Sequence, residues 1–286
     1  MLIDFRVRPP FKSFLGSFLY RPRTPDAAPQ NIPPLQIGLK PYRSFTEQSM
    51  SAFWEEFERA GIDLGVVMGR TAPPEFGSIP NEDVAELVAT NPKKLIGFGS
   101  VGGTDIATSL AAIDRIVALG LRGVAMDNGY WAMHEDDPRL FPVYEKIQQA
   151  GLILSLTSSM FIGADMSYCM PVHLQRVARR FPDLPILVPH GGWPWTTEMC
   201  AVAFQCSNVY LVMDFYMHVP NMPGAEQYLR SANYFLSHRI LYGSSYPVWS
   251  LEQSVEQFRA LAFANDEIRQ RCMGGNAARL LGLRQG

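Results

Sequence analysis

The chain has 286 residues, of which 47% are hydrophobic and 18% are charged. This length suits one large domain, and the apolar content suffices for a sizeable core, so extensive disorder is excluded. The net charge of −2, with no long basic block, argues against nucleic acid or an anionic membrane surface as the main partner.

The first predicted element is a short strand that begins at residue 2. A largely apolar run from Leu2 to Phe5 favours a strand, and two prolines close it. A strand so near the start predicts the first strand of a closed barrel. Arg6 and Arg8 alternate with Val7, so both guanidiniums should point to the same side. Taken alone, this pair favours a solvated strand end slightly over an anion site.

The segment from about 9 to 43 is rich in proline and lacks a helical or strand period. It is too long for an ordinary connector in a compact domain. It is also too aromatic for a simple linker, with Phe11, Phe14, Phe18 and Tyr20 in its first half. We therefore expect a long ordered loop insertion over one mouth of the fold, and such a loop would also suit a subunit interface.

From residue 44 on, segments with helical periodicity alternate with short apolar runs. We predict helices over 44–60, 82–90 (capped by Asn81), 105–119, 138–150, 167–181, 195–205, 225–236, 251–263 and 266–281. We predict further strands over 62–69, 95–101, 123–127, 152–157, 184–190, 209–214 and 239–245.

The continuous apolar character of these strands indicates burial on both faces, as in parallel sheets. Eight βα units predict a single (β/α)8 TIM barrel over residues 1–286. A doubly wound open sheet is the alternative, but no strand is followed by a glycine-rich phosphate loop.

Polar side chains gather where the predicted strands end, which is where such barrels carry their active sites. They are Arg6, Arg8, Arg70, Ser100, Asp127, Asn128, Thr157, Ser158, His190, Asp214, Ser244 and Ser245. His190 is the strongest candidate, because the glycines that follow it leave room for a ligand. For the others, ordinary roles stay open: capping for the two aspartates, ion pairing for Arg70, and loop hydrogen bonding for Thr157 and the serines.

The other histidines lack the setting of His190. His134, His173 and His238 fall in predicted loops or helices, where surface or capping roles are more usual. His218 follows the seventh strand closely enough to reach the mouth of the barrel.

Five pieces of the sequence resemble one known family when they are taken together. They are Met1-Leu2-Ile3-Asp4, the segment 136–144, Pro189-His190-Gly191-Gly192, Tyr242-Gly243-Ser244-Ser245-Tyr246-Pro247, and the segment 275–283. In order and spacing they resemble the amidohydrolase superfamily, in particular its family-2 branch around aminocarboxymuconate-semialdehyde decarboxylase.

The resemblance implies a divalent metal, usually zinc, that polarises water or substrate. Its ligand positions in the family are two histidines of the first strand, one histidine after the fifth strand and an aspartate after the eighth. Here those positions carry Arg6, Arg8, Thr157 and Ser245. One remaining imidazole, that of His190, does not make a zinc site, and two fixed positive charges would repel a dication. We therefore expect no metal and no other cofactor.

Without the metal, Arg6 and Arg8 would hold a carboxylate or a developing oxyanion. His190 would move the proton, with Asp214 or Asp127 orienting it or acting as base in its place. The predicted function is metal-independent hydrolysis or decarboxylation of a small carboxylated substrate.

Other side chains complete the predicted substrate site. Arg70, Thr157 and Ser245 would add polar contacts, and Trp193 and Tyr216 would suit a flat or aromatic substrate.

Two other functions stay open. The chain would be a catalytically silent subunit that pairs with a catalytic homologue, or a protein that binds a small molecule without turnover. An enzyme should have an open pocket above Arg6, Arg8 and His190, whereas a silent subunit should fill that space with side chains. We expect a homo-oligomer, or a hetero-oligomer with a related subunit.

The cysteines and the first residues indicate a cytoplasmic protein. Charged side chains within the first eight residues are incompatible with a signal peptide, and no apolar run reaches membrane-spanning length. Neither a CxxC pair nor a zinc spacing occurs among the cysteines, which we interpret as reduced thiols: Cys169, Cys200, Cys206 and Cys272.

Overall fold

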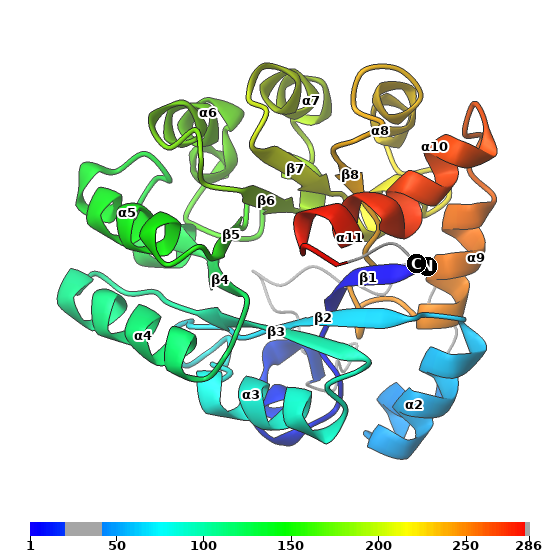
Figure 1. Ribbon diagram of the computed structural model, residues 1–286, viewed down its shortest axis with the longest axis horizontal. Helices are drawn as coiled ribbons and strands as arrows, with labels where there is room; N and C mark the ends of the chain where they lie inside the picture. Colours follow the sequence, from blue (N-terminus) through cyan, green and yellow to red (C-terminus); the bar gives the residue numbers. More distant parts are fainter. Residues whose placement is uncertain (21–41, 284–286) are drawn as a thin grey trace.

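The computed structural model describes residues 1–20 and 42–283. Its eight strands pair in parallel in chain order: β1 (Ile3–Val7), β2 (Leu64–Met68), β3 (Leu95–Ser100), β4 (Gly123–Met126), β5 (Ile153–Leu156), β6 (Ile186–Pro189), β7 (Val209–Val212) and β8 (Ile240–Leu241). β1 also meets the far edge of the sheet, since the amide of Phe5 donates to the carbonyl of Tyr242 at 3.0 Å. The sheet thus closes into the predicted TIM barrel (Figure 1).

Helices form the outer layer around the strands (Figure 1). They are α1 (Arg43–Thr46), α2 (Met50–Arg59), α3 (Asn81–Thr90), α4 (Ile106–Ala118), α5 (Phe141–Gln149), α6 (Pro171–Arg180), α7 (Thr196–Gln205), α8 (Ala225–Ala232), α9 (Leu251–Arg259), α10 (Asp266–Gln270) and α11 (Asn276–Leu280). A π-helical segment, Arg271–Gly275, joins the last two. Short 3-10 helices occupy Lys12–Gly16, Phe18–Tyr20, Asn128–Trp131, Pro138–Leu140, Met166–Cys169, His190–Gly192 and Asp214–Met217.

The core has two parts, as expected for strands buried on both faces. Side chains that point into the barrel form one cluster, and those that point to the helices form the other. The inner cluster includes Ala277, Ala278 and Leu281, at and just beyond α11. Because α11 and the residue after it pack against the barrel interior, they close one end of the barrel. The mouth lies at the other end, at the carboxyl ends of the strands.

A bulge in β1 places the two arginines of that strand. Asp4 pairs with Gly65, but the next pair joins Val7 to Val67, so β1 has one extra residue. The extra residue reverses the alternation. Phe5 packs inside the barrel, and Arg6 and Arg8 both line the pocket at its mouth. The two arginines therefore share one side of β1, as predicted, and the bulge turns that side toward the pocket.

Several predicted boundaries were wrong for local reasons. The helix expected over 44–60 is broken at Gln48, whose φ is +48°, and Ser49 caps α2 by accepting from the amide of Ala52. Asn81 does not cap α3. Its side-chain oxygen accepts from the amide of Ser100 at 2.7 Å and its nitrogen donates to the same residue's carbonyl, so it joins α3 to the end of β3.

Only part of the predicted loop insertion can be placed. Residues 9–20 are described and include two 3-10 helices, whereas 21–41 lie outside the described residues. Phe18 and Leu19 line the pocket at the mouth of the barrel. These described residues of the segment therefore contribute to the wall of the pocket, and the course of the whole insertion stays a prediction.

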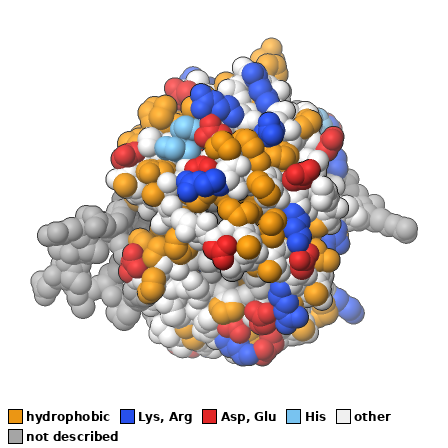
Figure 2. Space-filling model, turned by 90° about the vertical axis from the view of Figure 1, so that its left-hand side faces the viewer, with side chains coloured by type: hydrophobic (Ala, Val, Ile, Leu, Met, Phe, Trp, Pro, Cys, Tyr) orange, Lys and Arg blue, Asp and Glu red, His pale blue; other side chains and the backbone are white. Residues whose placement is uncertain are grey.

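The face of the molecule in Figure 2 has no large patch of only positive or only negative side chains. Acidic and basic side chains are interspersed there with hydrophobic ones, on the side of α4 and α5 (Figure 2). Among the described residues, no helix is both long enough and apolar enough to cross a membrane.

Candidate active site

Three residues just beyond the last three strands share an unusual backbone conformation. His190, Asp214 and Ser245 have φ angles of +65°, +54° and +62°. The left-handed region costs a residue other than glycine roughly 1–2 kcal/mol, and it persists only where the surrounding structure fixes it. Such strain gathers at functional sites. Its recurrence at three adjacent strand ends marks this rim of the barrel as the candidate site.

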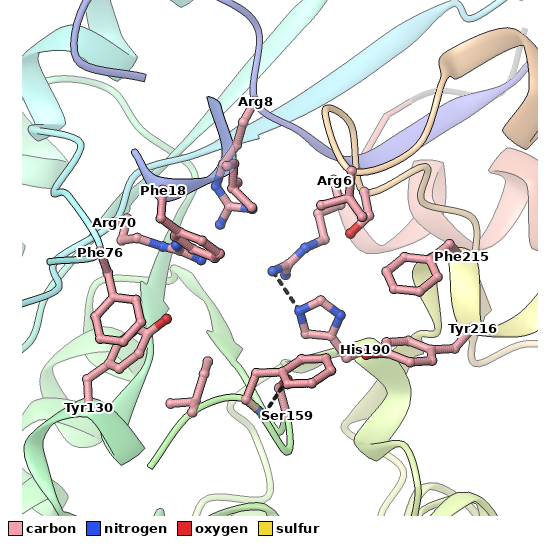
Figure 3. Close-up of a pocket in the computed structure, with 15 residues that line it drawn as sticks. Arg6, Arg8, Phe18, Arg70, Phe76, Tyr130, Ser159, His190, Phe215 and Tyr216 are labelled. Atoms are coloured by element: carbon pink, nitrogen blue, oxygen red, sulfur yellow. Dashed lines mark hydrogen bonds between the residues drawn. The ribbon is translucent and has the colours of Figure 1, made fainter. Parts of the chain in front are cut away.

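Arg6, His190 and Asp214 form one group on this rim. The Arg6 Nη2 donates to His190 Nε2 at 3.0 Å, as Figure 3 shows. On the other side of the ring, His190 Nδ1 lies 3.0 Å from Asp214 Oδ2, and the same oxygen accepts from the His190 backbone amide at 3.1 Å. Arg6 Nε lies 3.4 Å from this oxygen as well. One carboxylate therefore orients both the imidazole and the guanidinium.

These contacts define the protonation state of His190. A guanidinium only donates hydrogen bonds, so Nε2 must accept and the ring proton must lie on Nδ1, toward Asp214. Burial lowers the pKa of His190, and the Arg6 charge lowers it further, against the opposing effect of Asp214. Burial opposes ionisation of Asp214, but Arg6 and His190 outweigh it and hold its pKa below the usual value. At neutral pH the group is a neutral imidazole between a guanidinium and a carboxylate.

Arg8, Arg70 and Asp127 form a second group. Arg70 Nε lies 3.5 Å from Asp127 Oδ2, and the Arg70 guanidinium lies over the ring of Phe18 at 4.9 Å. Burial opposes ionisation of Asp127. Its charged neighbour Arg70 and a hydrogen bond from Thr157 outweigh that effect and lower its pKa. The pKa of Arg8 is also lowered, by burial and by the charges of the other two arginines.

The positive charge at this site exceeds the negative charge facing it. Arg6, Arg8 and Arg70 are 3%, 4% and 5% exposed, and the carboxylates paired with them in the described part of the chain are Asp127 and Asp214. A third carboxyl, Asp4, accepts from the amides of Arg6 and Ser244, but burial raises its pKa to about 7. A buried surplus of guanidinium charge is costly unless an anion meets it.

The three arginines open onto one narrow pocket (Figure 3). It encloses about 630 Å³, with the solvent at its opening included. Its lining is Arg6, Arg8, Phe18, Leu19, Arg70, Phe76, Tyr130, Ser159, Phe161, Ile162, His190, Phe215, Tyr216, Ser245 and Val248. A small molecule with at least one anionic group and an apolar or aromatic body matches this lining.

The structure divides the predicted site residues into two layers. Arg6, Arg8, Arg70, His190, Tyr216 and Ser245 line the pocket. Asp127 and Asp214 lie behind the arginines as their ion-pair partners. Thr157 hydrogen-bonds Asp127, and Trp193 stacks on Tyr216 at a ring distance of 5.0 Å. Neither Thr157 nor Trp193 lines the pocket. Each would affect substrate binding only through its neighbour, Thr157 through Asp127 and Trp193 through Tyr216.

The other histidines lie apart from the pocket. His218 Nε2 lies 2.9 Å from the Ser254 hydroxyl, and burial lowers the pKa of this histidine to about 3. His218 therefore does not reach the mouth as the sequence had allowed. His173 pairs with Asp136 at 2.7 Å, and the ring of His134 stacks on that of His173.

Much of the apolar lining was missed by reasoning from sequence. Phe76, Tyr130, Phe161 and Phe215 come from the loops after β2, β4, β5 and β7. The available signal was their position, since the loops after the strands form the active-site face of such barrels. Nothing in residue type or spacing distinguishes them from other loop aromatics.

The donor set does not fit the divalent metal that the resemblance implies. The positions of the family's ligands carry Arg6, Arg8, Thr157 and Ser245, and arginine has no lone pair to offer a metal. Among the described residues, no three His, Cys, Asp or Glu side chains come together in a group able to hold a metal ion. No chemical step is therefore derived through a metal.

Comparison with known proteins agrees with the resemblance. The sequence pattern of the family described as Amidohydrolase matches residues 31–283, a range that does not include Arg6 and Arg8. A curated relative from Dictyostelium discoideum, named 2-amino-3-carboxymuconate-6-semialdehyde decarboxylase, is 24% identical over 80% of this chain and 75% of its own length.

Solved structures agree on the barrel. An uncharacterised TIM-barrel protein of Bordetella bronchiseptica is 36% identical, with a TM-score of 0.89 and 98% of each chain covered. 5-Carboxyvanillate decarboxylase of Sphingomonas paucimobilis is 20% identical, with a TM-score of 0.62, 81% of this chain covered and 82% of that one. This second likeness concerns the fold.

Proposed function

The chain belongs to the amidohydrolase family, and we propose on that basis that it is a metal-independent member that cleaves a small carboxylated compound. The observation that carries the proposal is the surplus of buried arginine around one narrow pocket, beside a neutral histidine. An anionic substrate compensates that charge, and guanidiniums hold carboxylates by paired charge-assisted hydrogen bonds.

Substrate binding would also release His190 for proton transfer. In the free protein the Arg6 Nη2 occupies the lone pair of His190 Nε2. A carboxylate that accepts from Arg6 competes for that donor and leaves Nε2 free to face the substrate. Asp214 holds the other ring nitrogen and stabilises the imidazolium that forms when Nε2 takes a proton.

Two reactions fit this arrangement. In hydrolysis, Nε2 removes a proton from water as the oxygen attacks a carbonyl carbon, and Arg6 or Arg8 stabilises the oxyanion. When the oxyanion re-forms the carbonyl, the scissile C–O or C–N bond breaks and the His190 imidazolium returns its proton to the leaving oxygen or nitrogen. In decarboxylation, the neutral His190 ring first takes up a proton from solvent on Nε2. The C–C bond to the carboxylate then breaks, CO₂ leaves, and the electron pair left on carbon takes that proton from Nε2. The names of the Dictyostelium relative and of the Sphingomonas structure favour decarboxylation of an aromatic or muconate-type carboxylate.

The competing proposal of a silent subunit requires side chains to fill the space above the arginines. The pocket lined by Arg6, Arg8 and His190 favours an enzyme or a binding protein instead. A homo-oligomer, a cytoplasmic location and a partner subunit stay predictions.

Turnover of a panel of carboxylates tests the proposal. Purified protein is incubated with aromatic and muconate-type acids, with CO₂ release followed in a coupled assay and ring or amide opening followed by absorbance. We expect at least one acid to be converted, and the His238→Asn protein to convert it equally well, since His238 contacts Arg271 and Arg279 away from the pocket. A failure to convert any acid, with a stable complex formed with a related chain, would favour the silent subunit.

A further inference from the structure

The barrel closes along a seam between β1 and the chain that follows β8. β8 is only two residues long, so the seam continues beyond it. The amide of Phe5 donates to the Tyr242 carbonyl, and the amide of Arg8 donates to the Tyr246 carbonyl, each at 3.0 Å. Between these two contacts, Arg6 lies on one side of the seam and residues 243–245 lie on the other.

The carboxyl group of Asp4 joins the two sides of the seam at this point. Its Oδ1 accepts from the backbone amide of Arg6 at 3.0 Å and from that of Ser244 at 2.9 Å. The Ser244 hydroxyl in turn donates to the Arg6 carbonyl at 3.4 Å and accepts from the amide of Tyr246 at 3.0 Å. Side chains therefore hold both the amide and the carbonyl of Arg6.

Asp4 and Ser244 act from behind the wall of the pocket. Both are 0% exposed, and neither lines the pocket, whereas Arg6 does. A buried amide that loses its acceptor cannot bond to water instead, so loss of the Asp4 oxygen would favour a shift of the Arg6 backbone. Asp4 can affect a bound substrate only through the residues that it holds.

The seam uses one acceptor oxygen of Asp4 rather than its negative charge. The other oxygen, Oδ2, has no hydrogen-bond partner among the described residues. Burial raises the pKa of Asp4 to about 7, against the hydrogen bonds from Ser244 and Arg6. The group is therefore partly uncharged near neutral pH. Asparagine, which has the same acceptor oxygen, should replace it.

Arg6 has little room to move without losing its contacts. Its Nη2 donates to His190 Nε2 at 3.0 Å (Figure 3), and its Nε lies 3.4 Å from Asp214 Oδ2. The chain opposite packs closely on this group, since a Cβ on Gly243 would lie 3.0 Å from Asp214 Oδ1 and 3.4 Å from the Arg6 Cβ. Misplacement of a catalytic group by about 1 Å can cost about 100-fold in rate.

We propose that Asp4 is a positioning residue, which holds the Arg6 backbone at the seam and so fixes the Arg6 guanidinium against His190 and Asp214. This inference rests on the proposed function, in which Arg6 holds the substrate carboxylate or oxyanion. Asp4 itself touches neither the substrate nor the reacting atoms. Its effect on activity should therefore disappear once the Arg6 guanidinium has been removed. A residue that only closes the barrel would instead affect stability alone, or lower activity equally with and without Arg6.

A double-mutant cycle with Arg6 tests the proposal. We expect Asp4→Ala to lower kcat/KM by about 10- to 100-fold, and Asp4→Asn to stay within about threefold of wild type. In the Arg6→Gln background, Asp4→Ala should cost less than about threefold. Equal losses in both backgrounds, or a loss in Asp4→Asn as large as that in Asp4→Ala, would overturn the proposal.

The pKa of His190 is a readout that does not require turnover. The Arg6 charge is one of the causes that lower this pKa. If Asp4→Ala displaces the guanidinium, the pKa of His190 should rise toward the ordinary value of 6.5, measured from its ring resonances in NMR spectra of the free protein. Asp4→Asn should leave it unchanged. A pKa of His190 that Asp4→Ala does not change would mean that Asp4 only closes the barrel, and would overturn the proposal.

Asp63→Ala is the matched control. Asp63 accepts from the amide of Leu2 at 2.7 Å, so it holds the same part of the chain just before β1, at the end away from the mouth. It does not line the pocket. We expect its kcat/KM and its His190 pKa to equal those of wild type, with all variants assayed below their own unfolding temperatures.

Ser244→Ala keeps the test decisive if Asp4→Ala does not fold. It removes the hydroxyl that donates to the Arg6 carbonyl and leaves the Asp4 carboxyl group in place. We expect a smaller loss of kcat/KM than in Asp4→Ala, and no further loss in the Arg6→Gln background. An equal loss in both backgrounds would overturn the proposal.

The outcome is separable from that of the proposed function. In a protein that converts no acid, the calorimetric affinity for benzoate replaces kcat/KM in the same cycle. Weaker benzoate binding and a raised His190 pKa in Asp4→Ala would then support the positioning role, although the catalytic proposal fails. Turnover that Asp4→Ala does not change would refute the positioning role and leave the catalytic proposal standing.

Discussion

Replacement of His190 by asparagine is expected to lower kcat by about 10²- to 10⁴-fold, the usual contribution of a positioned general acid or base. Asparagine retains a polar group near Arg6 and Asp214, so the substrate should bind with little change in KM. The measurement is steady-state turnover of whichever acid the wild-type protein converts. Unchanged kcat in His190→Asn, with the His238→Asn control also at wild-type level, would contradict the assignment of His190.

The pH dependence distinguishes the two reactions of His190. Burial and the charge of Arg6 lower its pKa below the ordinary value of 6.5. If the neutral ring removes a proton from water, activity rises with pH through this lowered pKa and is constant above it. If the imidazolium donates a proton to carbon, activity is highest at low pH and declines as pH rises through the pKa of the substrate complex. The profile of kcat against pH should therefore identify hydrolysis or decarboxylation.

Replacement of Arg6 by glutamine is expected to lower kcat/KM by about 10²- to 10³-fold, because the substrate carboxylate or oxyanion loses a preorganised buried charge. The change should also raise the pKa of His190, since burial, the Arg6 charge and the Arg8 charge all lower it and the change removes the second of these causes. The pH profile should shift upward by the same amount. A merely structural role for Arg6 would lower activity without moving the profile.

The same change will affect stability, so it needs a companion variant. Without Arg6, the buried Asp214 keeps only His190 as a partner, and breaking a buried ion pair costs about 3–5 kcal/mol. Arg6→Gln/Asp214→Asn should recover part of the free energy of unfolding in urea, but not the activity. Activity near the wild-type level in either variant would contradict a role for Arg6 in substrate binding or catalysis.

The fold was predictable because its signal is carried by whole segments. Strands such as Leu64–Met68 and Ile186–Pro189 are continuous apolar runs, which two-sided burial requires, and helical segments separate them. Boundaries were less predictable, because they depend on single contacts. The amide of Asn81 suits a helix cap, yet it binds the backbone of Ser100, a residue that only the folded barrel brings near.

The candidate site was predictable where chemistry lies at strand ends. Alternation put Arg6 and Arg8 on one side, and the glycines after His190 marked its turn as open to a ligand. The bulge in β1 and the left-handed backbone of Asp214 and Ser245 could not be predicted, because they depend on register between strands. The aromatic walls lie in loops, whose course is set by packing rather than by residue periodicity.

We propose that arginine charge, and not a metal ion, stabilises the substrate at the centre of this barrel. The most direct measurement is turnover of an accepted carboxylate by protein treated with a strong chelator, with its metal content determined by mass spectrometry on the same sample. We expect full activity without stoichiometric zinc or manganese, and no gain when either ion is added back. Loss of activity on chelation, restored by about one zinc or manganese per chain, would contradict the claim.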